Sequence, residues 1–186
     1  AGLSINTSLT EKSTMLLSVR RSYLQFLFQA LKLPFLPTYN DLQFKYTYKP
    51  DKKNQFNIIA LAAVDNFELN TSVNDDEEDP LQIAQNNYTL GVLPVNEQWN
   101  YTLGGTWKHF FEESNLFAVI SRSHLNNTAE KYRDNIESVQ NKLLEYESQE
   151  IENKSRVEYN FRKNGVKFNI GLGLDQVTYL NSTFQK

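Results

Sequence analysis

The stretch TYNDLQFKYTYK, residues 38–49, alternates apolar and polar side chains with a strict period of two. Four apolar or aromatic residues fall on one face of such a segment: Leu42, Phe44, Tyr46 and Tyr48. Four polar or charged residues fall on the other: Asp41, Gln43, Lys45 and Thr47. Successive side chains of a β-strand point to opposite faces, so this pattern predicts a strand with an aromatic face and a charged face.

The same alternation recurs along the chain and groups into hairpins. A polar turn at residues 49–54 is followed by a second candidate strand over Gln55–Phe67. Three further pairs of alternating segments are present: residues 3–7 with 15–20, 99–108 with 116–125, and 156–161 with 166–175. The turn of the last pair contains Asn164-Gly165, a dipeptide typical of tight hairpins. The sequence therefore predicts an all-β, antiparallel up-and-down meander of about eight strands, each roughly ten residues long.

The connections between these hairpins are long, in contrast to the turns within them. They cover residues 21–37, 68–85 and 126–147. Short turns at one end and long loops at the other are typical of transmembrane β-barrels, in which a tilted strand of about ten residues spans the bilayer. The sequence thus predicts a barrel segment with long extracellular loops. A soluble β-sandwich stays open, because composition alone does not say whether the apolar face meets a protein core or lipid.

Two segments in the long connections have the residue spacing of amphipathic helices. One is Ser22–Lys32, followed by Leu33-Pro34, and the other is Glu130–Tyr146. We expect both to be short helices that pack over a barrel mouth. The acidic run Asn74–Asp79 is expected to be a solvated loop, since it lacks the glycine and the spaced carboxylates of an EF-hand calcium loop.

Composition narrows the classes of function. The chain has 186 residues, a formal net charge of -3, no cysteine and two histidines. An acidic balance argues against nucleic-acid binding, and the absence of cysteine excludes disulfides, thiolate metal sites and cysteine nucleophiles. No apolar run is long enough for a membrane-spanning helix. No residues at catalytic or metal-ligand spacing are apparent, so we expect neither an enzyme nor a cofactor.

Three groups of residues, spread over most of the chain, carry a resemblance to one family. The first runs from Arg20-Arg21-Ser22-Tyr23-Leu24 through Leu33-Pro34-Phe35 to Pro37, Tyr39, Asp41, Lys45 and Tyr48. The second comprises Trp99-Asn100, Trp107, Phe111, Asn115-Leu116-Phe117 and Ser121, and the third is residues 164–171. Together they resemble the TonB-dependent outer-membrane receptors of Bacteroidetes-type bacteria.

The resemblance implies a role in nutrient import. Receptors of this family are 22-stranded barrels that an N-terminal plug domain closes. They import iron chelates, cobalamin or glycans with energy relayed by TonB. We therefore expect residues 1–186 to be part of a single β-barrel domain, the strands that follow the plug, with the plug and the remaining strands absent. The expected partners are outer-membrane lipid, the protein's own plug and, through it, TonB, with the nutrient unidentified.

The same hypothesis assigns candidate site residues to the strands. Five polar residues would face the barrel lumen or the plug if Leu17, Val19, Leu42 and Phe44 face lipid: Ser18, Arg20, Asp41, Gln43 and Lys45. A polar barrel wall must be hydrogen-bonded, and the plug supplies partners for it. No ligand-binding residue is assigned. A complete eight-stranded barrel for adhesion or anchoring is the alternative in another class of function, because eight strands can close.

Overall fold

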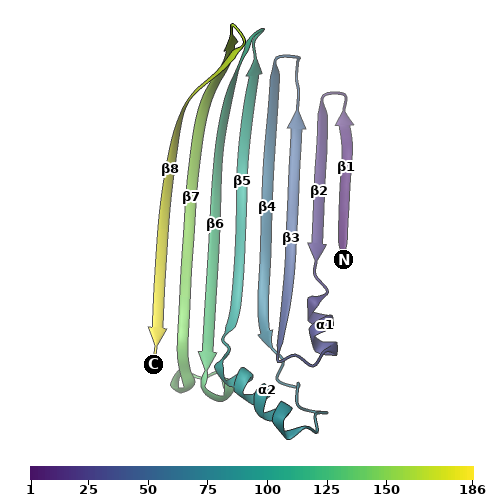
Figure 1. The fold of residues 1–186 in the computed structure, drawn as a ribbon, viewed down its shortest axis with the longest axis vertical. Coiled ribbons are helices and arrows are strands. Elements are labelled where there is room, and N and C mark those ends of the chain that lie inside the picture. Colours follow the sequence, from purple (N-terminus) through teal and green to yellow (C-terminus); the bar gives the residue numbers. More distant parts are fainter.

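The computed structural model describes all 186 residues and contains one open, eight-stranded antiparallel sheet (Figure 1). The strands are β1 (Gly2–Thr10), β2 (Ser13–Arg21), β3 (Phe35–Tyr48), β4 (Asn54–Leu69), β5 (Val95–Phe110), β6 (Ser114–Tyr132), β7 (Lys142–Lys163) and β8 (Val166–Gln185). Their order in the sheet is their order in the sequence, and every neighbouring pair is antiparallel. The predicted all-β up-and-down meander is confirmed.

The four hairpins turn tightly at one end of the sheet, as the sequence predicts. Asn164 and Gly165 have φ angles of 51° and 77°, so both central residues of the β7–β8 turn are left-handed. Such a turn follows the right-handed twist of the flanking strands, and Asn-Gly adopts it at low cost. In the wider β3–β4 turn, the Asp51 carboxylate accepts hydrogen bonds from the backbone N–H groups of Lys53 and Asn54, at 2.7 and 2.8 Å.

The connections at the opposite end contain two α-helices. The helix α1 (Leu24–Ala30) lies within the predicted segment 22–32. The helix α2 (Pro80–Val92) follows the acidic run, and the sequence analysis does not predict it. Its start has a recognisable signal, because the Asp79 side chain accepts a hydrogen bond from the Leu81 N–H at 3.0 Å and Pro80 occupies the first helical turn.

The predicted helix over Glu130–Tyr146 is wrong. The strand β6 continues to Tyr132, β7 begins at Lys142, and only two 3₁₀ turns, η1 (Arg133–Asn135) and η2 (Val139–Asn141), lie between them. Asp134 and Asn135 have positive φ angles of 55° and 57°, which are incompatible with a continuous right-handed helix. The strands are correspondingly longer than the predicted ten residues, with 19 residues in β6, 22 in β7 and 20 in β8.

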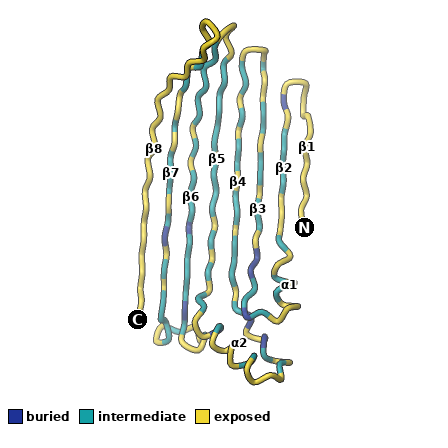
Figure 2. The backbone as a smooth tube through the Cα atoms, viewed as in Figure 1, coloured by how far each residue is buried: buried dark blue, intermediate teal, exposed yellow.

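The sheet is a single layer without a core of its own. Only 11 of the 186 residues are buried (Figure 2). Apart from two prolines, the buried apolar residues are Val73 and Leu90, which belong to the loops and helices rather than to the sheet. Neither helix is long and apolar enough to cross a membrane. The large apolar side chains of the strands are therefore exposed, and they need a partner outside this sheet.

The β3–β4 turn yields a pH-dependent prediction. Hydrogen bonds from the Asn54 side chain and the Lys53 N–H lower the pKa of Asp51 below its ordinary value. Because the folded pKa is depressed, this contribution to stability is present above the unfolded pKa and is lost as pH falls through the folded pKa. We expect Asp51→Ala to accelerate amide exchange at Lys53 and Asn54 at neutral pH, and this effect to become smaller as pH falls below the Asp51 pKa. The control is Asp51→Asn, which keeps an acceptor oxygen without the charge and should give the two amides the same, smaller protection at neutral and at low pH. An Asp51→Ala effect that is constant with pH would contradict the assignment.

Candidate functional site

The register of the sheet collects apolar side chains on one side, which we call the apolar face. One row across six strands illustrates it: Tyr48, Phe56, Trp107, Ala118, Val157 and Leu172 lie directly opposite one another. The apolar side chains of this face are strongly exposed in several strands. Ile120 is 67% exposed, Leu172 82% and Leu174 71%. The apolar face is thus a largely hydrophobic surface rather than a scatter of single residues. It is interrupted by Arg122 and Asn153, which lie in the row of Leu103 and are joined by a hydrogen bond of 3.0 Å.

Aromatic rings border the apolar face toward the tight turns. Seven rings form a chain across four strands and one turn, each centroid 4.6 to 6.4 Å from the next: Phe56, Trp107, His109, Phe111, Tyr159, Phe161 and Phe168. We call this chain the aromatic row. Rings prefer such tilted or offset contacts, and rows of aromatic side chains mark the two interfaces of membrane barrels.

A second aromatic cluster lies nearer the helices. The Trp99 ring lies 6.3 Å from Tyr101 and 4.7 Å from His124, on the same face of β5 and β6. Beyond it the apolar character of the face ends. The side chains that continue this face on β6 and β7 are polar: Asn126, Thr128, Glu147 and Gln149.

The apolar residues of this face form a band, which we call the apolar band, that crosses the strands obliquely. On β5 it reaches from Trp107 down to Trp99, whereas on β8 it runs from Phe168 to Leu174 and is followed by Gln176. Leu174 lies at the level of Gly105, so the band on β8 is displaced toward the tight turns relative to the band on β5. An oblique band is the geometry of strands that tilt across a slab-like apolar environment.

The five sequence-predicted site residues lie together on the opposite side, which we call the polar face. Ser18 pairs with Gln43, and Arg20 pairs with Asp41. The Arg20 Nε donates to both carboxylate oxygens of Asp41, at 2.8 and 3.1 Å. Lys45 is on the same face opposite Leu16 and Ile59 and makes no ion pair. The register therefore brings all five together, in two cross-strand pairs and one free ammonium group.

Cross-strand hydrogen bonds extend the polar face over the central strands. The Asn57 side chain accepts from the Thr47 hydroxyl and donates to the Thr106 hydroxyl, both at 2.8 Å. Two ion pairs line β7, with Lys154 at 2.7 Å from Glu152 and Arg156 at 2.9 Å from Glu158. The sequence alone does not single out Asn57, because most of residues 55–67 are apolar. Its polar side becomes apparent only once the register aligns Asn57 with Thr47 and Thr106.

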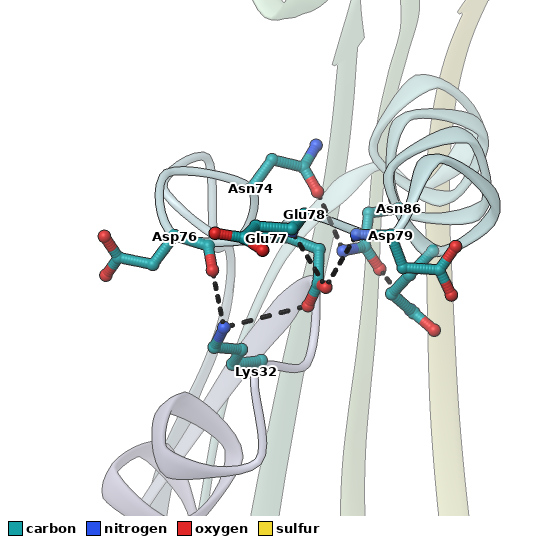
Figure 3. A network of polar contacts seen from close by, with 8 residues as sticks. Lys32, Asn74, Asp76, Glu77, Glu78, Asp79 and Asn86 are labelled. Carbon is teal, nitrogen blue, oxygen red and sulfur yellow. Dashed lines mark hydrogen bonds and ion pairs between the residues drawn. The ribbon is translucent and has the colours of Figure 1, made fainter.

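The acidic run is a structured part of the loops (Figure 3). The Lys32 ammonium donates to the Asp76 carbonyl at 3.1 Å and lies 3.7 Å from the Glu77 carboxylate. Glu77 also accepts hydrogen bonds from the N–H groups of Glu78 and Asp79. Asn86, the most buried side chain, donates to Asn74 at 2.8 Å. These contacts join α1, the acidic run and α2 into one loop assembly.

A buried lysine fixes the other end of α2. The Lys131 ammonium donates to the carbonyls of Leu90 and Leu93, at 2.6 and 2.9 Å, and to the Asn135 side chain at 2.7 Å. A cation there satisfies carbonyls that the helix leaves unpaired and complements its dipole. Burial lowers the pKa of Lys131, and no carboxylate compensates. The sequence analysis does not identify Lys131, because the relevant partners come from a helix it did not predict.

The sequence was also compared with known proteins. No protein-family model matches it, and no curated protein matches it. The two faces of the sheet and the resemblance of residues 20–48, 99–121 and 164–171 remain as the indications of function.

The Lys131 contacts predict the behaviour of α2. We expect Lys131→Met, which keeps the aliphatic chain but removes the ammonium, to leave the Leu90 and Leu93 carbonyls unsatisfied and to weaken the docking of α2 by about 1–3 kcal/mol. Amide exchange across α2 measures this as faster local opening. The matched control is Lys52→Met, in the exposed β3–β4 turn at the other end of the sheet, which should leave α2 unchanged. Equal protection of α2 in all three proteins would show that Lys131 does not hold the helix.

Proposed function

We propose that this chain is part of the wall of an outer-membrane β-barrel, in a receptor that imports a nutrient with energy from TonB. The apolar face supports the proposed membrane location, because it is an exposed hydrophobic band with aromatic rings along its borders. In a bilayer this band meets the hydrocarbon, and the aromatic row lies at the interface on the side of the tight turns. The loop assembly then lies on the extracellular side.

The polar face supports a lumen that contains water or a plug. Water or a polar domain can solvate the paired Arg20 and Asp41 and the hydrogen-bonded Asn57. Placing these groups against hydrocarbon would cost free energy. In the proposed receptor Ser18, Arg20, Asp41, Gln43 and Lys45 contact the plug. Lys45 has no ionic partner within the sheet, so an acidic or carbonyl group of the plug is the expected one.

The single-layer sheet favours a barrel wall over the soluble sandwich. A sandwich buries the inner face of each of two sheets, whereas here the apolar face has no second layer and Leu103 is 54% exposed. The TonB-dependent step of the proposal rests on the resemblance of residues 20–48 and of the later segments to that receptor family. The nutrient belongs to one of its classes, an iron chelate, cobalamin or a glycan.

Two adjacent positions on β4 test the membrane assignment. Ala60 lies on the apolar face opposite Phe44 and Leu103, and Leu61 lies on the polar face opposite Gln43 and Thr102. An arginine facing lipid near the bilayer midplane costs about 2–4 kcal/mol, while one facing a lumen costs little. We expect Ala60→Arg to lower the stability measured by urea titration in lipid vesicles by that amount, and Leu61→Arg to change it little. Equal effects of the two substitutions, or a protein that is monomeric and β-rich without detergent, would overturn the proposal.

The energy source is tested in the organism that makes the protein. We expect loss of this protein and loss of TonB to cause the same growth defect on the imported nutrient, with no further defect in the double mutant. Additive defects would show that the protein works independently of TonB. A barrel for adhesion or anchoring would give no nutrient-dependent defect at all.

A further inference from the structure

The helix α1 contacts β3 through Gln25 and Phe28 and leaves its other large apolar residues exposed. Its inner side touches β3: the Ser22 N–H donates to the Tyr39 carbonyl at 2.8 Å, and the Gln25 side chain accepts from the Thr38 hydroxyl at 3.2 Å. Phe28 is the one aromatic residue on this side. A helix on a water-soluble protein shows the reverse arrangement, with its apolar stripe against the core.

The outer side of α1 is a stripe of large apolar residues. Leu27 lies in the helix, and Tyr23 and Leu31 are the residues that flank its two ends. The three are spaced four residues apart and are 62%, 52% and 60% exposed. Residues four apart lie one above another on a helix, so the three form a single ridge. Phe26 flanks the ridge and is 65% exposed. Leaving such a ridge in water costs roughly 25 cal/mol for each Å² of apolar surface.

The position of α1 indicates what covers the ridge. The helix lies beside the edge of β3, where β1 and β2 have already ended (Figure 1). The chain enters it directly from Val19 and Arg21, the last residues of β2 on the apolar face. Val19 is 48% exposed and belongs to the band that meets lipid in the proposed function. The ridge therefore begins two residues after Arg21, where β2 and its apolar face end.

The charge of Arg21 indicates that a lipid surface covers the ridge. Arg21 is exposed on the apolar face at this border and makes no ion pair. Basic side chains at the edge of an apolar surface reach outward to anionic headgroups, while apolar and aromatic side chains of an interfacial helix enter the boundary between headgroups and acyl chains. A lipid surface with anionic headgroups matches both the ridge and the free guanidinium.

We propose that α1 is an interfacial helix whose ridge, Tyr23, Leu27 and Leu31, lies in the outer leaflet of the membrane, with Arg21 at the anionic headgroups. It anchors the β2–β3 connection to the membrane surface. Through Lys32 and the acidic run it also fixes the height of the loop assembly above that surface. This inference rests on the proposed membrane location of the sheet.

Residues 1–186 contain no cysteine, so any cysteine introduced there is the only labelling site within this part of the protein. In the whole protein reconstituted in nanodiscs that contain anionic lipid, a fluorescent label at Leu27→Cys is read with lipids that carry a quencher near the headgroup. The control on the same helix is Gln29→Cys, also exposed but polar. Leu172→Cys reports on the apolar face and Gln43→Cys on the polar face. Leu31→Cys is the second ridge position, in case Leu27→Cys does not fold.

We expect quenching by lipid to be severalfold stronger at Leu27 and Leu172 than at Gln29 and Gln43. Quenching at Leu172 without quenching at Leu27 or Leu31 would overturn the interfacial helix and leave the barrel wall intact. If the ridge labels are then also shielded from a water-soluble quencher, protein covers the ridge instead of lipid. Absence of lipid quenching at Leu172 would overturn the proposed function and this inference with it.

Discussion

The antiparallel register is the constraint on which the rest of the structure depends. Of 135 backbone hydrogen bonds, 115 lie within helices and strands, so the strands satisfy one another's polar groups without help from side chains. Because side chains alternate between faces, a slip of one residue anywhere would exchange the two faces of a strand. In β5 it would place Thr102 among the apolar residues and Leu103 beside Ser123. The match of apolar residues across β2, β3, β4 and β5 therefore fixes the register there, and the tight turns hold it.

The same hydrogen-bonding constraint links the sheet to its proposed environment. The outer edges of β1 and β8 present backbone groups without a partner in this sheet. Water satisfies such groups, but hydrocarbon does not, so a sheet with lipid against its apolar face requires further strands along both edges. Outside the bilayer, side chains can serve instead. Lys131 at the carbonyls of α2 and Asp79 at its first turn are of this kind, and both lie in the loop assembly.

Sequence periodicity predicted the meander, the hairpin at Asn164-Gly165 and the shared face of Ser18, Arg20, Asp41, Gln43 and Lys45, because each depends on local order. The partners of these residues were not predictable in the same way. That Arg20 pairs with Asp41 requires the register between β2 and β3, and that Lys131 caps α2 requires contacts between residues some forty positions apart. The start of α2 was predictable in principle, since Asp79-Pro80 combines a capping residue with a proline in the first turn.

The predicted strands are too short because the alternating pattern of apolar and polar residues covers only part of each strand. Alternation of apolar and polar residues predicted the strand over 116–125, and β6 then continues for seven residues in which both faces are polar. Two polar faces give no periodic signal, although backbone pairing with β7 continues through Glu130 and Glu145. The predicted strand ends beside Trp99 and His124, where the second aromatic cluster closes the apolar band. In the proposed function these seven residues lie outside the bilayer, where side chains on both faces meet water. The apolar face of β6 already becomes polar a few residues earlier, at Arg122.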